Sequence, residues 1–322
     1  MDRRSFIAAG LGLPLATMAG RACAESGPLT KIIFPFAAGG SGDTLCRLVA
    51  KEIGQPLDRT VIVEDRNGAD GLIGIRYVKN AKPDGTTILV TTGPTMYLLP
   101  MVETHPSFNT DKDFMPVSLL ARFDFCVVAG PAVDAKDFKG FVAWLKAHPD
   151  QATFGVPSNG TIPHFAGTKL SQELGIPLTR VAYRGTTPIL NDLIGGHLPF
   201  AITPVSDVVA HKESGTLKVF AVSSVKRSPY LPDVPTLKDE GIDLVADAWY
   251  GMWLPAGSPP DFAKQLANAV HTALAKPDVQ QKLKAAGLIA VGSTTDELVQ
   301  ELKTDIARWG PVVKATGYKI TN

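Results

Sequence analysis

The sequence predicts an α/β fold of two lobes, each with a mainly parallel sheet flanked by helices. Apolar strand-like runs alternate along the chain with longer segments of helical periodicity, which is typical of parallel sheets. The chain has 322 residues, and domains commonly hold about 100 to 200 residues, so the length suits two units. Hydrophobic residues make up 45% and charged residues 20%, an ordinary globular composition.

The first 24 residues predict a secretory signal of the twin-arginine type. Arg3 and Arg4 precede a short apolar run at 7–19, and Ala22-Cys23-Ala24 forms a small-x-small cleavage site. A membrane span needs about 20 apolar residues, and this run is shorter and rich in Gly, Ala and Pro. A lipoprotein anchored through Cys23 is the alternative. We favour cleavage after Ala24 and export to a bacterial periplasm.

The remaining chain divides into strands and helices by periodicity. Predicted strands lie at 31–36, 61–64, 87–92, 125–129, 153–156, 179–183, 199–203 and 217–223. Predicted helices lie at 44–53, 138–147, 163–173, 187–194, 260–275, 277–286 and 294–309. The first helix places Leu45, Leu48, Val49 and Ile53 on one face. Asp278 and Thr294 are the N-caps that we expect for the last two helices.

Two segments without clear periodicity predict the crossings between lobes. They lie at 104–121 and at 228–235, the latter with three prolines. The first lobe would then hold both chain ends, 25–121 and 236–322, and the second lobe would hold 122–235.

Charge and cysteine content exclude several classes of function. The net charge of +1 indicates no general affinity for nucleic acid or acidic membranes. Cys46 and Cys126 remain after cleavage, and two buried free thiols are favoured over a disulfide, although the periplasm would allow one. The chain has no CxxC or HxH spacing, so we expect neither a metal nor a cofactor.

A glycine-rich loop after the first strand predicts an anion site. Residues 37–43, AAGGSGD, run from a strand into a helix, where free N–H groups and the helix dipole favour a negative group. The loop lacks the GK[ST] ending of a P-loop, and it matches neither GxGxxG nor GxSxG. Asp43 is interpreted as a first-turn helix residue. A tight turn without a ligand is the alternative interpretation.

Three further loops follow strands and carry small or hydroxyl residues. The stretch 91–95 includes Thr92 and Gly93, and the stretch 156–164 runs into a helix that begins near His164. His164 would either touch a carboxylate or be satisfied by local backbone. In the stretch 183–188, Arg184 would either clamp a carboxylate or point to solvent.

Four segments in order resemble a known receptor family. They are FPFAAGGSGDTLCRLVA, VIVEDRNGADGLIG, VAYRGTTPILNDLIGGHLPFAI and WYGMWLPAGSPP. Their order and spacing resemble the Bug-type receptors, the solute-binding proteins of tripartite tricarboxylate transporters, over essentially the whole mature chain. The chain departs from the family pattern at Ala38, at 65–68, at Asp70 and at 157–161. The last departure falls in an expected ligand loop.

The resemblance implies a two-lobe periplasmic binding protein of the type II kind, with the ligand in the cleft. One carboxylate would be held through backbone N–H groups and bridging waters at Phe36, Ala37, Ala38, Gly39, Gly40 and Ser41. The other lobe would contribute Ser158, Asn159, Gly160, Thr161, His164, Gly185, Thr186 and Thr187. Asp207 would line the cleft or cap a helix. Specificity would depend on side chains at the far end, for which the candidates are Met96, Tyr97, Asn159, Ile162 and Pro204.

The function that this implies is capture of a di-, tri- or aromatic carboxylate and delivery to a permease of one large and one small membrane subunit. Such a carrier is a monomer by default and not an enzyme. One alternative is an exported α/β hydrolase that uses Ser158 and His164, for which the spacing suggests no acid partner. Another is a receptor that signals to a membrane sensor kinase.

Overall fold

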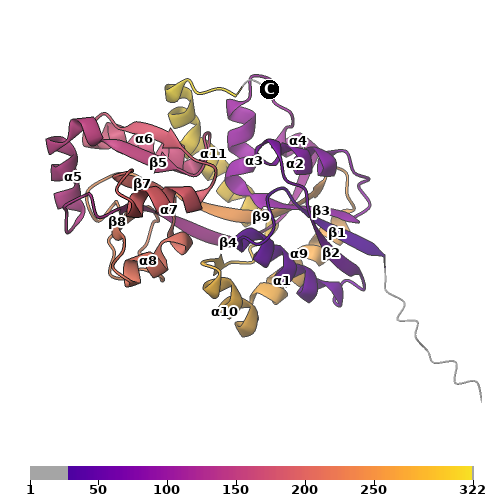
Figure 1. Ribbon diagram of the computed structural model, residues 1–322. Helices are drawn as coiled ribbons and strands as arrows, with labels where there is room; N and C mark the ends of the chain where they lie inside the picture. The colour runs from indigo at the N-terminus through magenta and orange to yellow at the C-terminus, as the bar shows by residue number, and fades with distance from the viewer. Residues whose placement is uncertain (1–27, 321–322) are drawn as a thin grey trace, which may run out of the picture.

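The computed structural model describes residues 28–320, which form one mixed sheet flanked by helices (Figure 1). The predicted signal at 1–24 lies outside the described residues. The strand order is β2-β1-β3-β9-β4-β7-β5-β6, with β8 and β10 also pairing with β4. The strands are β1 (Leu29–Phe34), β2 (Thr60–Asp65), β3 (Thr87–Thr92), β4 (Phe114–Ala129), β5 (Thr153–Val156), β6 (Thr179–Ala182), β7 (Phe200–Pro204), β8 (Lys218–Val222), β9 (Asp247–Pro255) and β10 (Ile289–Ala290).

The helices largely follow the predicted periodicity. They are α1 (Ser41–Gly54), α2 (Leu72–Lys79), α3 (Gly93–Val102), α4 (Thr110–Asp113), α5 (Phe138–Ala147), α6 (Ile162–Leu174), α7 (Thr186–Ile194), α8 (Val209–Glu213), α9 (Pro260–Leu274), α10 (Pro277–Ala285) and α11 (Thr295–Thr316), with short 3-10 turns η1 (Ala69–Gly71), η2 (Pro149–Gln151) and η3 (Val205–Asp207). Thr294 caps α11 in a capping box with Glu297, as predicted. Asp278 does not cap α10, because Pro277 takes the first helical position and places the cap at Lys276.

One long strand joins the two halves of the molecule. β4 pairs with β9 as far as Asp124, and from Phe125 onward it pairs with β7 and β8. The segment 104–121 is therefore not an irregular crossing, because it contains α4 and the first half of β4. The run 117–121 is buried on both faces of the sheet, so its sequence shows no alternation. The division into lobes at 121/122 and 235/236 stays a prediction.

The outer strands run parallel and the central ones antiparallel. β1 pairs in parallel with β2 and β3, and β5 pairs in parallel with β6 and β7. β9 runs antiparallel to both β3 and β4, because it carries the chain back from the second half to the first along β4. The α/β fold is confirmed, and the sheet is mixed.

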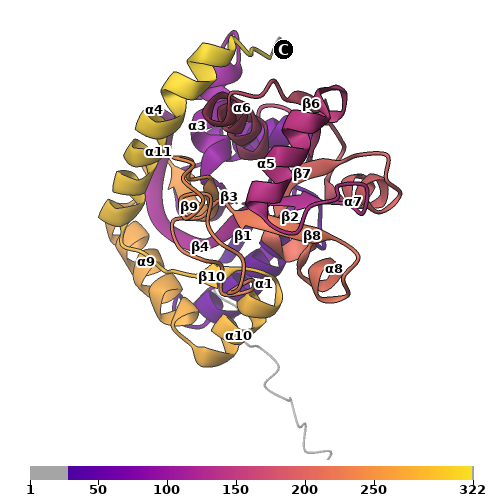
Figure 2. The ribbon, with the colours of Figure 1, turned by 90° about the vertical axis from the view of Figure 1, so that its left-hand side faces the viewer.

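Helices from the C-terminal part cover one side of the molecule. Figure 2 shows α9, α10 and α11 following one another along that side. α1 and α9 pack into the same apolar cluster through Leu45, Val49, Leu266 and Val270, all fully buried. Cys46 lies in this cluster as a free buried thiol, and Cys126 is free and buried in another, as predicted. None of the helices described between residues 28 and 320 is long and apolar enough to cross a membrane.

Charged side chains gather where β4 changes partners. The Arg122 guanidinium lies 3.0 Å from the Asp247 carboxylate on β9 and 2.7 Å from the Glu301 carboxylate on α11. The Trp249 indole N–H donates to Asp305 at 2.8 Å, which links β9 to α11 a second time. Burial raises the pKa of Asp124 and that of Asp305 to about 6. This ionic junction ties α11 to the strands that connect the two halves.

Candidate ligand-binding site

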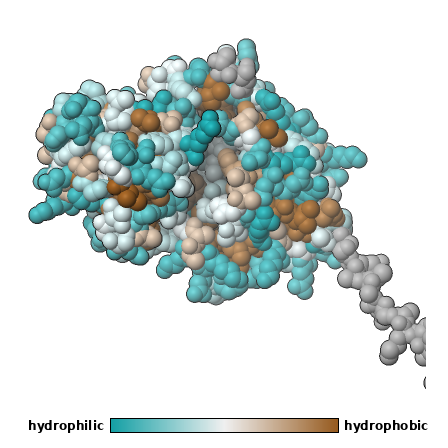
Figure 3. Space-filling view, viewed as in Figure 1, coloured by the Kyte–Doolittle hydropathy of each residue, from teal (hydrophilic) through white to brown (hydrophobic). Residues whose placement is uncertain are grey.

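A cavity of about 340 Å³ lies between the two halves of the sheet. The first half contributes residues that follow β1 and β3, and the second half contributes residues that follow β5, β6 and β7. The space-filling view shows the surface hollowed between the two halves (Figure 3). The lining residues are Phe36, Asp70, Thr92, Pro94, Thr95, Leu98, Leu99, Phe123, Phe125, Pro157, Ser158, Asn159, Gly160, Thr161, Ile162, Pro163, Thr186, Pro204, Ala248 and Ile320. We call it the central cavity.

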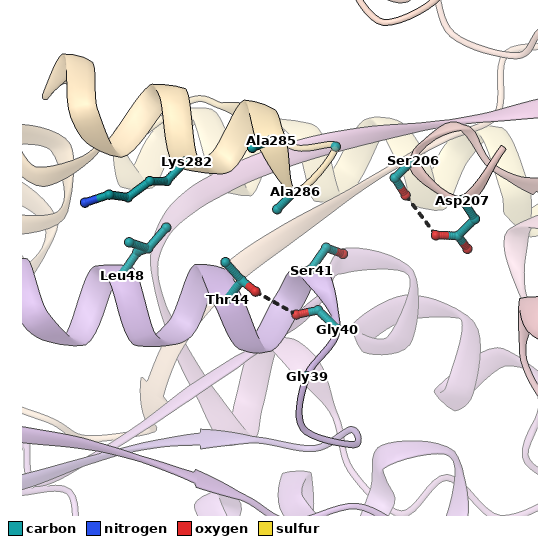
Figure 4. Close-up of a pocket in the computed structure, with 11 residues that line it drawn as sticks. Gly39, Gly40, Ser41, Thr44, Leu48, Ser206, Asp207, Lys282, Ala285 and Ala286 are labelled. Carbon is teal, nitrogen blue, oxygen red and sulfur yellow. Dashed lines mark hydrogen bonds between the residues drawn. The ribbon is translucent and has the colours of Figure 1, made fainter. Parts of the chain in front are cut away.

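A second cavity of about 680 Å³ lies on the other side of the glycine loop. The start of α1, η3 and the end of α10 surround it (Figure 4). Ser41 and Asp207 face this space from two elements, while the Lys282 side chain points away from the glycine loop. The lining residues are Gly39, Gly40, Ser41, Thr44, Leu48, Ser206, Asp207, Lys282, Ala285, Ala286 and Gly287. We call it the outer cavity. The loop 36–41 thus lies between the two cavities, with Phe36 at one and the glycines at the other.

Asp43 holds the glycine loop in shape. Its Oδ2 accepts the Gly39 N–H at 2.8 Å, and its Oδ1 lies 2.8 Å from the Arg47 guanidinium one turn along α1. Asp43 is therefore a first-turn helix residue, as predicted. Gly39 has a φ of 89°, which favours glycine. The first N–H groups of α1 have no partners within the helix, so the loop presents donors to an anion.

The buried His164 side chain stabilises the loop between β5 and α6. Its Nδ1 accepts the Gly160 N–H at 3.0 Å, its Nε2 faces the Arg180 guanidinium, and Tyr318 packs edge-on at 5.0 Å between ring centres. Burial, and next the Arg180 charge, lower the pKa of His164 to about 4, so the imidazole is neutral at pH 7. His164 is 3% exposed and lies outside the cavity lining, which matches the local-backbone interpretation.

The hydrolase alternative finds no support in this geometry. The Ser158 hydroxyl donates to the Asn159 carbonyl at 3.4 Å, and both ring nitrogens of His164 have other partners. A nucleophile needs its base within hydrogen-bond reach, and within the described chain no hydrogen bond joins Ser158 to His164. The same residues 28–320 contain no cluster of His, Cys, Asp or Glu that would hold a metal ion.

Threonine residues lie at the starts of α3, α6 and α7, the other helices that begin at the central cavity. Thr92 caps α3, accepting the Thr95 N–H at 3.3 Å, and the two hydroxyl groups lie 2.6 Å apart. Thr186 is the first residue of α7, directly after Gly185 with a φ of 94°. The Thr161 hydroxyl donates to the Ser158 carbonyl at 2.9 Å just before α6. Arg184 is exposed and does not line the central cavity.

The predicted site residues therefore fall into three groups. Those at the central cavity are Phe36, Thr92, Ser158, Asn159, Gly160, Thr161, Thr186 and Pro204. Those at the outer cavity are Gly39, Gly40, Ser41 and Asp207. Those that line neither are Ala37, Ala38, Gly93, His164, Gly185 and Thr187. Of the residues expected to set specificity, Ile162 lines the central cavity, whereas Met96 and Tyr97 are buried in the core. Ligand contact stays a prediction for all of them.

Sequence reasoning missed Asp70, Phe123, Phe125 and Ile320, which line the central cavity. Phe123 and Phe125 flank the point where β4 changes partners, and their rings pack edge-on at 5.5 Å between ring centres. An aromatic pair spaced by two in a strand signals a shared face, although it does not show that the face borders a cavity. Ile320 lies near the C-terminus, and no sequence pattern around it indicates that it lines a cavity.

Comparison with known families decides the class. The sequence profile of the tripartite tricarboxylate transporter family receptor matches residues 45–318. The chain belongs to this family of solute-binding receptors.

Among its relatives, protein BugT of Bordetella pertussis is 28% identical over 316 residues, covering 97% of each chain. The solved structure of periplasmic binding protein BugD is 29% identical with a TM-score of 0.77, covering 92% of this chain and 99% of that one. MatC from Rhodopseudomonas palustris, solved with bound malate, is 28% identical with a TM-score of 0.76, covering 89% and 99%. The predicted periplasmic-binding-protein fold is confirmed.

Proposed function

We propose that this protein is exported to the periplasm, captures a small carboxylate in the central cavity without altering it, and delivers it to a membrane permease of one large and one small subunit. The observation that carries the proposal is a single cavity bordered by helix starts from both halves of the sheet. Thr92 is the N-cap of α3 in the first half. In the second half, Thr161 is the N-cap of α6 and Thr186 is the first residue of α7. Bound malate in the related MatC supports a carboxylate as ligand.

Neutral donors suit a ligand that must be released again. The first N–H groups of a helix lack partners within the helix, and the helix dipole favours an anion near them. Hydroxyl groups and bridging waters complete the hydrogen bonds of a carboxylate without a buried cation. Closure of the halves about β4 and β9 would bring the donors of both sides onto one ligand. Binding is then tied to a change of shape that a permease recognises.

The first test is a thermal-shift screen of residues 25–322 against mono-, di-, tri- and aromatic carboxylates. A ligand at 100 times its dissociation constant stabilises the folded state by about 2.7 kcal/mol. We expect a clear shift for one class, with the acid recovered chemically unchanged. No shift with any carboxylate, or conversion of the acid, would refute the proposal.

A matched pair of isosteric substitutions locates the site. Asn159 lines the central cavity and is exposed, so Asn159→Asp adds a negative charge beside the expected carboxylate and should weaken binding about tenfold. Asn191 is exposed on α7 away from the cavity lining, so Asn191→Asp should leave the affinity unchanged. Equal effects of the two substitutions would place the ligand elsewhere.

Delivery to a permease is tested by uptake of the labelled acid in cells that carry the permease but lack this receptor. We expect the wild-type chain and Asn191→Asp to restore uptake, and Asn159→Asp to restore less of it at low ligand concentration. Full uptake without any receptor would contradict a delivery role.

A further inference from the structure

Asp70 stands out at the central cavity because it is the single charged residue among those described that line it. It lies in η1 with a φ of 54°, a left-handed conformation that aspartate tolerates better than most residues. It is exposed, and within the described chain it forms no hydrogen bond or ion pair. Asp70 and Ile320 of the C-terminal segment both line this cavity.

The rest of the wall is largely apolar. Phe36, Phe123 and Phe125 form an aromatic side of the cavity, with Phe36 also packed edge-on against Phe34 at 5.3 Å between ring centres. Leu98 and Ile162 add aliphatic surface from α3 and α6. A pocket of this kind binds the hydrocarbon part of a ligand by removing it from water.

Among the described residues, no Lys or Arg lines the central cavity. Arg180 faces the His164 ring and lies over the Tyr318 ring at 5.9 Å. Arg66, four residues before Asp70, pairs with Glu64 at 2.5 Å and stacks on Tyr77 at 3.6 Å. Lys282 belongs to the outer cavity and points away from the glycine loop. A second carboxylate at the Asp70 end of the central cavity would therefore face a negative charge that no basic side chain of the lining offsets.

We infer that the central cavity takes a monocarboxylate with an apolar body, and that Asp70 excludes acids carrying a second carboxylate at the opposite end. The inference rests on the proposed function, and it narrows the ligand class from di-, tri- and aromatic acids to acids with one charged end. In this respect the chain would differ from the related MatC, which was solved with malate, a diacid. The helix starts hold the single carboxylate, and the aromatic and aliphatic wall holds the hydrocarbon part. The negative charge of Asp70 repels a second carboxylate at the other end of the ligand.

The test measures the affinities of matched acids for residues 25–322 by isothermal titration calorimetry. The pairs are hexanoate with adipate and benzoate with terephthalate, each differing only in the second carboxylate. We expect at least one monoacid to bind, and its partner diacid to bind about tenfold more weakly or worse. In Asp70→Asn the diacid should gain about tenfold while the monoacid changes less than about threefold.

Asp58→Asn is the control. Asp58 is also exposed with a positive φ, 50°, and does not line the cavity, so this variant should keep the wild-type ratio of affinities. A diacid that binds the wild type as tightly as its monoacid partner would overturn the inference, as would an unchanged ratio in Asp70→Asn. Tighter binding of 6-aminohexanoate than of hexanoate would also overturn it, because the cavity would then prefer a ligand with a cationic group at the end opposite its carboxylate. Absence of binding by every acid would instead refute the proposed function itself.

Discussion

His164 should make the protein lose stability as the pH falls from 7 to 5. Its pKa is about 4 in the folded chain against an ordinary value of 6.5, because burial and the Arg180 charge disfavour the imidazolium. Between pH 7 and pH 5, His164 therefore binds a proton in the unfolded chain but not in the folded chain. The free energy of unfolding decreases as the pH is lowered. The stabilisation is complete above pH 6.5 and is lost as the pH drops towards 4.

The magnitude follows from the two pKa values. Integrating the proton linkage between them gives a loss of about 2 kcal/mol from this residue between pH 7 and pH 5. His164→Asn removes the titrating group, and the amide oxygen replaces Nδ1 as acceptor for the Gly160 N–H. The carboxyl groups elsewhere are the same in both proteins, so they cancel in the comparison.

The assay is urea denaturation at pH 7 and pH 5, followed by circular dichroism. The wild type should lose about 2 kcal/mol more than His164→Asn between these two pH values. Carboxylate affinity at pH 7 should change less than about threefold in His164→Asn, because His164 holds the loop and does not line the cavity. Equal pH dependence of the two proteins would refute the assigned environment of His164.

Three further substitutions test other parts of the structure. Asp124→Asn should raise the free energy of unfolding at pH 7.5 by up to about 3 kcal/mol and add little at pH 4. Burial raises the pKa of Asp124 to about 6, so this carboxyl destabilises the fold progressively as the pH rises from about 4 to 6 and fully above that range; equal gains at both pH values in urea denaturation would contradict this. Gly93→Ala places a Cβ 2.2 Å from the Trp249 ring and should lower the melting temperature through about 1 to 3 kcal/mol of overpacking, so an unchanged melting temperature would count against that packing. Asp43→Ala frees the Gly39 N–H and loosens the loop that places Phe36 at the central cavity, so it should weaken carboxylate binding severalfold in calorimetry; an unchanged affinity would show that the position of Phe36 does not depend on Asp43.

Periodicity and loop chemistry predicted much of the fold. The helices α1, α6 and α7 and the loops before them follow a strand–loop–helix pattern that one short stretch of sequence can reveal. The apolar face of α1 and the Thr294 capping box are local in the same sense. These features depend on neighbours within a few residues.

The features that sequence reasoning missed depend on distant contacts. The sequence of β9 is almost uniformly apolar because the strand is buried between β3 and β4. It therefore lacks the alternation of polar and apolar residues that indicates a strand. Asp70 and Ile320 reach the central cavity from opposite ends of the chain. The single loop 36–41 borders two cavities, because Phe36 lines the central cavity and residues 39–41 line the outer cavity together with η3 and α10.

The most direct test of a carboxylate held between the two halves is an NMR titration of the protein labelled with ¹⁵N at glycine. The Gly93 amide of the first half directly follows Thr92, which lines the central cavity, and the amides of Gly160 and Gly185 lie in loops of the second half. We expect the monoacid of highest affinity to shift the signals of both halves together and to saturate at one ligand per chain. Shifts confined to one half, or to glycines remote from these positions, would contradict binding between the halves.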